Sequence, residues 1–521
     1  MTRRIGIDFG TCNIKGAERK KNNTVSIKIG SSIDKQRVPN VILYKENEGG
    51  YKYNVGDAAL NRAANEQDRI RCVKSSLQEK GWNRELSFGN IRLTASDVIC
   101  DIMSYLYEDI HKANKKSDIS ATITVPVNFS ERQKMIVEKA AEKAGFTVDS
   151  VISEPFAAMF YLMEDYIDDD EKHNILIFDF GGGTLDFCLA SMYYDKNDRR
   201  IVETQSTVGI TYGGNDINKD ILNEILAVKY HEYIDKAFRQ VKNKFEEIIN
   251  KYYIFEAIDM LKSDLFDDEE VDEKRKEDVM VTLHDSSLLE FKGISVADIY
   301  ETFEKRGVKK KIHYLLDQLY DDSNIIIGET TDVFVVGGSA SIPYFRNILE
   351  IYFEENGYNN DIDDLFAIND DMDMDDRLYS SVAKGAAIYQ ELKNGDSDID
   401  IMIKEKIPFV VYTKNDSGKI QTKITKNDFY KDYFSNYAGI TKKMKEDKKI
   451  SVYQTIFGEE DREVYLGDIS LSDEIIGQAD LYKLKVDRNR EIEAVFGIIS
   501  EDASEDEIWD EWKCKLVIDT E

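Results

Sequence analysis

Cysteine is scarce in this chain: five residues in 521, scattered as Cys12, Cys72, Cys100, Cys188 and Cys514. No two of them form the Cys-x-x-Cys pair that is typical of structural zinc sites, and their spacing gives no disulfide framework. Isolated cysteines are typical of the reducing cytosol, whereas structural disulfides persist in oxidising compartments. We therefore expect no zinc site, no structural disulfides and a cytoplasmic protein.

Long apolar runs are also absent. No stretch reaches the roughly 18 residues that a membrane helix needs. The N-terminal segment MTRRIGIDFG has two arginines but no apolar run after them, and it enters a strand pattern at once. This is not the pattern of a signal peptide. We expect no membrane segment.

Positive charge is in deficit, with 69 Lys and Arg against 100 Asp and Glu and a formal net charge of −31. A surface of this charge repels the phosphates of nucleic acids and anionic membranes, so we expect neither as a partner. The length of 521 residues predicts more than one domain, because single cores rarely grow that large.

Residues 1 to about 390 alternate between strand and helix patterns. ATITVP is a β-rich run that Pro126 ends, and SERQKMIVEKAAEKAG has helical periodicity, with Ser130 as N-cap and Gly145 as the stop. This rhythm predicts the α/β class. We expect the highly charged residues 263–285 to form an exposed connection.

The character of the sequence changes near residue 393. KNGDSD (393–398) is polar and turn-rich, and IDIMIKEKIPFVVYT (399–413) then opens a β-rich region. The segments EVYLGDISL and YKLKVDRNREIEAVFGI continue it with strand patterns. A domain boundary is therefore expected between about 393 and 400.

An Asp-Phe-Gly turn occurs twice. GIDFGTCN follows the apolar run RRIGI, and FDFGGGTLD follows HNILIF, so that Asp8 and Asp179 each end a strand. The glycines let the backbone turn tightly with its N–H groups free, and such groups cradle phosphate oxygens. The two carboxylates suit Mg²⁺ held through water.

The repetition predicts an internal duplication, with two half-sites that face one polyphosphate and hydroxyl donors from Thr11 and Thr184. Chance explains one glycine-rich turn in an α/β protein, but it is a poor explanation for two that are each led by a strand and an Asp. Neither turn is a Walker loop, because Gly-x-x-x-x-Gly-Lys-Ser/Thr is missing, and neither is Gly-x-Gly-x-x-Gly.

Further segments follow in order over residues 3–392. They are CVKSSL with Lys74, TVPVNFSERQK with Pro126, ISEPFAAMFYL with Glu154, TVGITYGGNDIN with Gly213, Gly214 and Asp216, VFVVGGSASIP, and SSVAKGAAIYQ. Together with the two turns, they resemble the actin-like ATPase superfamily and, within it, the seventy-kilodalton heat-shock chaperones. The resemblance rests on collinearity, since each segment alone is unspecific.

The resemblance implies a site that binds ATP or ADP with Mg²⁺ and hydrolyses ATP, with K⁺ as a further candidate ion. Lys74 is expected to hold the attacking water and offset charge at the γ-phosphate. Asp186 or Asp179 is the favoured proton acceptor. The expected catalytic residues are Lys74, Glu154, Asp179, Asp186 and Thr184, and the expected metal residues are Asp8 and Asp179. The expected nucleotide contacts are Asp8, Gly10, Thr11, Cys12, Asn13, Gly181, Gly182, Gly183, Gly213, Gly214, Glu256, Ser263, Gly337, Gly338 and Ser339.

The adenosine pocket departs from the family pattern. EAIDMLKS supplies Glu256 and Ser263 at the expected spacing, but Asp259 and Met260 stand where the family has Lys and Arg. Ser341 likewise stands where an Arg commonly stacks on adenine, and each lost cation–π contact is worth about 0.5–2 kcal/mol. We expect weaker nucleotide binding, or a base held by packing on Met260.

The resemblance implies an α/β fold: a duplicated, ribonuclease-H-like ATPase domain over residues 1–392, a linker over 393–403 and a small β-rich domain over 404–521. No segment resembles the family's helical lid, so we expect weaker retention of peptide. The implied function is that of an ATP-dependent chaperone with slow hydrolysis. Its expected partners are unfolded polypeptide or one dedicated protein, with a co-chaperone and a nucleotide-exchange factor as further candidates.

Three alternatives remain. A filament-forming ATPase like actin or MreB would share the phosphate loops, but ISEPFAAMFY and the appended β-rich region argue against it. A sugar or acetate kinase would share the fold, but the triple-glycine second loop and the lack of an obvious sugar-binding insertion argue against it. A degenerate relative that works as a scaffold would follow if the altered adenosine pocket no longer holds the base.

Overall fold

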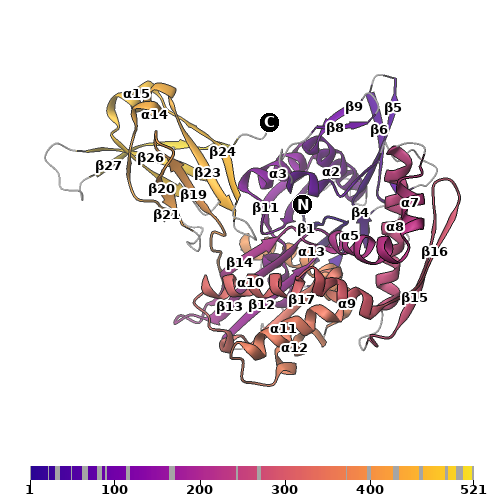
Figure 1. The fold of residues 1–521 in the computed structure, drawn as a ribbon. Helices are drawn as coiled ribbons and strands as arrows, with labels where there is room; N and C mark the ends of the chain where they lie inside the picture. Colours follow the sequence, from indigo (N-terminus) through magenta and orange to yellow (C-terminus); the bar gives the residue numbers. More distant parts are fainter. Residues whose placement is uncertain are drawn as a thin grey trace.

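Helices and strands are mixed throughout the computed structural model of this chain, so the fold is α/β as predicted (Figure 1). Among the described residues, no helix has the length and apolarity needed to cross a membrane. The structure describes residues 2–20, 23–29, 36–48, 50–60, 69–78, 85–88, 91–112, 118–163, 171–241, 244–266, 271–370, 372–395, 401–425, 433–456, 462–486, 491–499 and 508–518.

The first large sheet has the strand order β11-β10-β1-β2-β3, with β4 also paired to β2. Strand β1 runs antiparallel to β2 and parallel to β10, and β10 runs parallel to β11. The strands are β1 (Arg3–Phe9), β2 (Asn13–Lys20), β3 (Asn23–Ser26), β4 (Arg37–Pro39), β10 (Ile119–Val125) and β11 (Thr147–Ser153).

One face of this sheet is covered by α2 (Ala95–Lys112) and α3 (Glu131–Ala144), which share its apolar core. Helix α3 has the predicted ends. The Ser130 hydroxyl accepts a hydrogen bond from the Gln133 N–H as N-cap, and Gly145 ends the helix with φ 113°, a conformation that favours glycine. The capping pattern in the sequence was therefore sufficient to place this helix.

The second large sheet has the order β17-β12-β13-β14-β18. Strands β12, β13 and β14 form an antiparallel meander, and β17 runs parallel to β12. Its strands are β12 (His173–Phe180), β13 (Leu185–Tyr194), β14 (Arg200–Ile210), β17 (Asp332–Val336) and β18 (Ile401–Lys404). Its outer face packs on α9 (Val296–Lys305), α10 (Val308–Asp321), α11 (Pro343–Glu355) and α12 (Ile362–Asp370).

Two helices form a layer between the sheets: α4 (Glu154–Leu162) and α13 (Ser381–Lys393). Glycine lets them approach closely. A Cβ on Gly385 of α13 would overlap the Ala157 carbonyl of α4, and a Cβ on Gly6 of β1 would overlap the Ala383 carbonyl of α13. The strands β1 and β12 are buried on both faces, so their sequences read as nearly continuous apolar runs.

Smaller elements flank the two sheets in two groups, one on each side of the candidate site that is described below. On the first side lie α1 (Val73–Gln78), the sheet of β5 (Val41–Asn47), β6 (Gly50–Val55) and β7 (Arg69–Arg71), and the hairpin of β8 (Glu85–Phe88) and β9 (Ile91–Thr94). On the second side lie α5 (Gly214–Ile221), α6 (Ala227–Lys229), α7 (His231–Phe238), α8 (Lys244–Leu265) and the hairpin of β15 (Lys276–Thr282) and β16 (Leu288–Ser295).

The expectation of an exposed connection over residues 263–285 was wrong in part, because β15 lies within it. Val279 and Val281 alternate with the exposed residues Asp278, Met280 and Thr282, and the two valines pack into the core beneath the hairpin. The high charge of the exposed face masked a strand whose buried face is narrow. Residues 267–270 of the expected connection lie outside the described residues.

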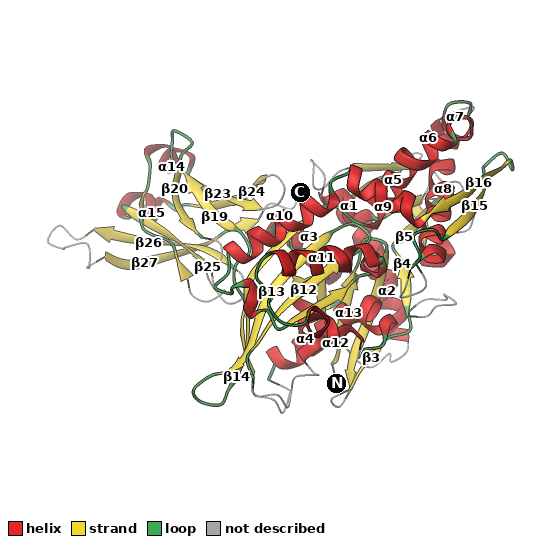
Figure 2. Cartoon of the chain, turned by 60° about the horizontal axis from the view of Figure 1, so that its bottom comes forward, coloured by secondary structure: helices red, strands yellow, loops and turns green. Residues whose placement is uncertain are grey.

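The C-terminal strands form a β-sandwich, which Figure 2 shows to one side of the two large sheets. One sheet contains β19 (Val410–Lys414), β20 (Ile420–Ile424), β23 (Lys449–Ile456), β24 (Arg462–Ser470) and β28 (Val517–Ile518). The other contains β21 (Tyr433–Phe434), β22 (Ala438–Gly439), β25 (Leu481–Val486), β26 (Ile492–Ile499) and β27 (Ile508–Lys515). Helices α14 (Lys442–Asp447) and α15 (Asp473–Gln478) lie at its end.

The sandwich is joined to the second sheet by β18, which pairs in parallel with β14 from Ile401 opposite Arg200 to Lys404 opposite Glu203. Thus the end of the expected linker is a strand of that sheet, and residues 396–400 of the linker lie outside the described residues. A cleft of about 480 Å³ lies between α3 and the sandwich.

Replacement of Gly385 by Ala is expected to lower the free energy of unfolding by about 1–3 kcal/mol, because the new methyl group must displace the backbone of α4. Gly477→Ala in α15 is the matched control, since nothing lies within 4 Å of its added Cβ. It should stabilise by about 0.5–1 kcal/mol through helix propensity. Urea unfolding of both variants checks this; equal effects at the two glycines would contradict the packing argument.

Candidate functional site

The site forms where the strands β1 and β12 end, and each strand delivers one carboxylate. Asp8 is directly opposite Lys15 in the β1–β2 pair, and the Lys15 ammonium lies 3.1 Å from Asp8 Oδ2. Asp179 is directly opposite Asp186 in the β12–β13 pair. Because side chains alternate along a strand, Asp8 lies on the face of β1 opposite to the apolar Ile7 and Phe9.

The two predicted glycine turns meet each other. A Cβ on Gly183 would come within 2.6 Å of Thr11 Oγ1, and a Cβ on Gly182 would overlap Cys12 Sγ. No larger side chain fits at either position without displacing the first turn. The contact brings two segments together that are about 170 residues apart in the chain, which is the arrangement that two half-sites around one ligand require.

Two further loops close on the second turn. The N–H groups of Gly214 and Asn215 donate to the carbonyls of Gly181 and Gly182 at 3.1 and 2.9 Å. The Ser339 hydroxyl donates to the Gly181 carbonyl at 2.9 Å. A Cβ on Gly214 would lie 2.7 Å from Ser339 Oγ, so the loops approach too closely to admit a side chain at Gly214. Gly337 has φ 88°, which allows this turn after β17.

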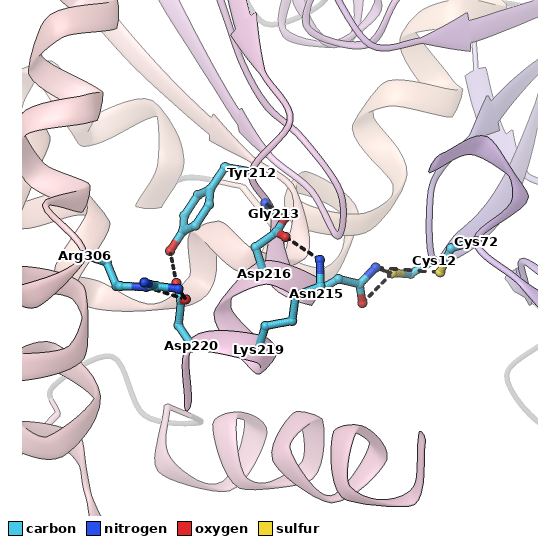
Figure 3. Close-up of polar contacts among 9 residues, drawn as sticks. All are labelled: Cys12, Cys72, Tyr212, Gly213, Asn215, Asp216, Lys219, Asp220 and Arg306. Atoms are coloured by element: carbon cyan, nitrogen blue, oxygen red, sulfur yellow. Dashed lines mark hydrogen bonds and ion pairs between the residues drawn. The ribbon is translucent and has the colours of Figure 1, made fainter. Parts of the chain in front are cut away.

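Figure 3 shows how the start of α5 is anchored on both sides. Asp216 Oδ2 accepts from the Gly213 N–H at 3.0 Å, as the Gly-Gly-x-Asp pattern requires. On the following turn, Asp220 accepts from the guanidinium of Arg306 at 2.6 Å and from the Tyr212 hydroxyl at 3.2 Å. These contacts hold the glycines of this turn in place.

Lys74 is buried at the junction of the loops, with 1% of its surface exposed. Its ammonium donates to the Phe9 carbonyl at 2.8 Å and is ion-paired with Glu154, the first residue of α4. A buried lysine with one carboxylate partner is held in a single position. This places a fixed positive charge beside the end of β1.

The carboxylates of the site share a buried space. Burial raises the pKa of Asp179 well above its ordinary value, and the nearby charges of Glu154, Asp186 and Asp8 raise it further. Burial, together with Glu154, also raises the pKa of Asp186 to about 8. The pKa of Glu154 is raised by burial and lowered again by Lys74. The negative charge of this cluster is therefore only partly compensated by the protein.

The donor set fits a hydrated Mg²⁺ ion. Asp186 Oδ2 is buried and has no hydrogen-bond partner among the described residues, so it lacks a partner such as water. The described residues contain no three His, Cys, Asp or Glu side chains placed to ligate a metal directly. Mg²⁺ in nucleotide sites uses one or two carboxylates, with water and phosphate as the other ligands, and Asp8 and Asp179 can provide the carboxylates.

The adenosine side is built differently from the expected pattern. Glu256 lies 3.5 Å from the guanidinium of Arg71, which in turn lies over the ring of Tyr252 at 4.7 Å. Met260 is 67% exposed, so in the protein alone it is not packed. Lys262, rather than a residue at the family positions, reaches the Gly214 carbonyl at 3.4 Å and Asp259 at 2.9 Å. Ser263 is exposed.

Most of the expected residues come together. Asn40, which the motifs did not include, fixes the first turn by donating its amide Nδ2 to the Gly10 carbonyl at 2.9 Å. Lys15, Arg71 and Asn215 were also missed. Strand register could have found Lys15, because a hairpin after Asp8 brings Lys15 opposite to it. The others have no signal in the sequence.

Comparison with known proteins agrees with this geometry. The sequence model of the family described as Hsp70 protein matches residues 71–506. The chain is a member of the Hsp70 protein family. Membership of this family disfavours the filament-forming alternative.

The Hsp70 relatives include three proteins named chaperone protein DnaK. That of Ureaplasma urealyticum serovar 10 is 26% identical over 82% of this chain and 65% of its own length. That of Halobacterium salinarum is 23% identical over 81% of this chain and 61% of its own length. That of Ureaplasma parvum serovar 3 is 26% identical over 81% of this chain and 63% of its own length. The chain thus spans less than two thirds of the length of these relatives.

Replacement of Asp179 by Asn is expected to stabilise the nucleotide-free protein. The raised pKa means that above the ordinary pKa of the unfolded chain the folded state must retain a proton or bury a charge. An amide at this position needs neither the retained proton nor the buried charge. The free energy of unfolding at pH 7.5 should therefore rise by about 1–3 kcal/mol, with about 1.4 kcal/mol for each pKa unit. The gain should shrink as the pH falls toward 4, where both states are protonated.

Urea unfolding across this pH range, with the exposed Asp364→Asn of α12 as control, checks this result. Equal stability of Asp179→Asn and the wild-type protein at pH 7.5 would show that folding does not disfavour the charged form of Asp179.

Proposed function

We propose that this chain is an ATP-dependent chaperone of the Hsp70 type, in which ATP binding and slow hydrolysis control a C-terminal β-sandwich that binds unfolded polypeptide or one dedicated protein. The observation that carries the proposal is the convergence of four glycine loops on buried carboxylates next to Lys74, in a chain whose residues 71–506 match the family. Residues 1–392 would form the ATPase domain, 393–403 the linker and 404–521 the substrate domain.

The ATPase domain is proposed to be a duplicated, ribonuclease-H-like pair. Support comes from the two large sheets, which repeat one arrangement. In each sheet three antiparallel neighbours follow in order, β1-β2-β3 and β12-β13-β14, and a parallel strand, β10 or β17, pairs with the first of them. Each first strand ends in the Asp of a glycine turn, Asp8 or Asp179. A duplication explains why the turn occurs twice.

The phosphates are proposed to lie among the four loops, whose glycines carry no side chain that would obstruct them. Mg²⁺ held by Asp8 and Asp179 through water would neutralise phosphate charge there. Lys74, fixed between Phe9 and Glu154, is positioned to hold a water molecule and to stabilise charge at the terminal phosphate. Lys15, beside Asp8, provides a second positive charge.

Asp186 is the proposed proton acceptor. Its Oδ1 accepts from the Val127 N–H at 3.1 Å, while Oδ2 is left without a partner. Burial and Glu154 raise the pKa of Asp186 to about 8, so the free protein holds a proton there near neutral pH; a nearby Mg²⁺ would lower this pKa and let the carboxylate accept a proton from the attacking water. Because the altered adenosine side offers Arg71 and Tyr252 rather than the family's usual cations, we expect modest nucleotide affinity.

A short route connects this base to the sandwich. The Val127 N–H bonds to Asp186, and four residues later the Glu131 N–H donates to Gln454 Oε1 of β23 at 3.1 Å. The next residue, Arg132, donates to the Tyr465 carbonyl of β24 at 3.3 Å. A movement of residues 126–130 on hydrolysis would therefore act directly on the sandwich. This supports coupling between the nucleotide and the bound polypeptide, which must be reciprocal.

Lys74→Met is expected to abolish hydrolysis while retaining nucleotide binding. The steady-state rate of phosphate release should fall by about a hundredfold or more, because the charge that stabilises the transition state is lost. Without Lys74, burial raises the pKa of Glu154 with no lysine charge to oppose it, which favours the neutral carboxyl in the variant. Calorimetric titration with MgADP should give a dissociation constant within about threefold of the wild-type value.

The matched control is Arg3→Met, which removes the ion pair with Glu18 at the opposite end of β1. It should hydrolyse ATP like the wild-type protein. Parallel assays in K⁺ and Na⁺ test the candidate monovalent ion. Lack of binding to the wild-type protein at millimolar nucleotide would overturn the ATPase proposal in favour of a degenerate scaffold.

Gln454→Ala is expected to uncouple the sandwich from the nucleotide. In the wild-type protein, ATP should change the affinity for a fluorescently labelled, unstructured apolar peptide by about 5–150-fold. Loss of the hydrogen bond to Glu131 should reduce that ratio by about fivefold, which corresponds to about 1 kcal/mol. Fluorescence anisotropy with and without ATP measures it.

Gln421→Ala is the control, because the Gln421 amide bonds to the Gly439 carbonyl within the sandwich. It should leave the ATP effect unchanged. An unchanged ratio in Gln454→Ala would exclude this route of coupling, and a wild-type protein that binds no unstructured peptide would favour a dedicated partner.

A further inference from the structure

Two cysteines that are 60 residues apart in the sequence lie together at the first glycine turn. One buried residue, Asn40, holds both backbones: its N–H donates to the Cys12 carbonyl at 2.7 Å, and its carbonyl accepts from the Cys72 N–H at 2.9 Å. Cys72 has φ 53°, a left-handed conformation that is uncommon for a residue other than glycine. The backbone thus fixes the pair before any contact between the side chains is considered.

The two thiols lie beside the same side-chain amide, that of Asn215. Figure 3 shows both sulfur atoms turned toward the side chain of Asn215, which belongs to α5. The Asn215 Nδ2 lies 3.5 Å from Cys12 Sγ and 3.7 Å from Cys72 Sγ. Cys12 also packs against Gly182, where a Cβ would overlap its sulfur. The pair therefore lies at the contact of the two phosphate turns.

The chemistry of the two thiols differs. The hydrogen bond from Cys12 lowers the pKa of Cys72, and the Asn215 amide lowers it further, while the same bond to Cys72 and burial raise the pKa of Cys12. A thiol of lowered pKa with a second thiol as its neighbour is the arrangement of an oxidisable pair. Both are partly exposed, whereas Cys100 and Cys188 are buried.

We propose that Cys12 and Cys72 are a redox pair, which a hydroperoxide closes to an intramolecular disulfide and a dithiol reopens, and that the disulfide blocks the nucleotide site. The second part rests on the proposed function of this cleft, whereas the first part does not. None of the chemistry proposed for hydrolysis uses either sulfur.

The reaction proceeds in two balanced steps. The Cys72 thiolate attacks one oxygen of hydrogen peroxide, the O–O bond breaks, and hydroxide leaves and is protonated to water, so that sulfenic acid forms. The sulfur of Cys12 then attacks the sulfur of the sulfenic acid, and the S–O bond breaks. Hydroxide leaves with the proton of Cys12 as a second water. The net change is two thiols and one peroxide to one disulfide and two waters.

The disulfide would alter the site at one point. Both sulfurs would withdraw from Asn215, and Cys12 would be drawn away from Gly182 toward Cys72. Because the backbone N–H groups of residues 11–13 belong to the first turn, this movement would change the positions of the N–H groups that are proposed to bind phosphate. We expect the affinity for MgADP to fall at least about tenfold on oxidation and to recover on reduction.

The first experiment needs no nucleotide. The full-length protein is treated with a small molar excess of hydrogen peroxide, alkylated, digested and analysed by mass spectrometry. A peptide pair linked through Cys12 and Cys72, absent after treatment with dithiothreitol, is the expected result. Cys514→Ser is the control, and it should give the same linked pair because Cys514 lies on β27 in the sandwich. Sulfinic acid at Cys72 without a link, or links to other cysteines, would overturn the redox pair.

The second experiment compares MgADP titrations of reduced and oxidised protein. In the wild-type protein and Cys514→Ser, oxidation should weaken binding at least about tenfold, whereas in Cys12→Ser and Cys72→Ser peroxide should have no effect. A linked protein that binds MgADP normally would overturn the regulatory part alone. Reduced protein that binds no nucleotide would overturn the proposed function and the regulatory part together, while the linked peptide still decides the redox pair.

Discussion

The structure depends on a group of like charges that is buried where two sheets meet. Asp8, Glu154, Asp179 and Asp186 share a space in which burial raises the pKa of the last three, and the buried Lys74 is ion-paired with Glu154. Carboxylates in such a space are favourable only when cations compensate them. The cations of the protein compensate the charge of this group only in part, with Lys74 beside Glu154 and Lys15 beside Asp8.

Close backbone packing makes this arrangement possible and also connects the site to the surrounding helices and sheets. The four loops approach one another without side chains between them, and α13 approaches β1 and α4 through Gly6 and Gly385. The strand that follows α13, β18, becomes part of the second sheet. On the other side, the segment from Val127 to Glu131 connects Asp186 to the sandwich through hydrogen bonds at each end. The carboxylates and the sandwich are thus joined by rigid elements on two routes.

Several contacts near the glycine turns are not given by the motifs that identify the family. Lys15 compensates Asp8, Arg71 stacks on Tyr252 across the cleft, and Cys12 pairs with Cys72. They supply charge and reactivity at points where the shared scaffold leaves a choice of side chain. Membership of the Hsp70 family therefore accounts for the shared scaffold of this protein, and these residues are where this chain differs from the family pattern.

The sequence by itself determined the α/β class, the helix from Ser130 to Gly145 and the two glycine turns, because caps, strand alternation and turn residues act over a few positions. Its collinear motifs also identified the family. Only the tertiary structure decided which charges share one space, that β15 pairs within a charged segment, that Lys262 rather than Met260 faces the cleft, and that two scattered cysteines meet over Asn40. Such contacts join residues tens to hundreds of positions apart, and no local pattern encodes a distance that arises only when sheets and loops pack.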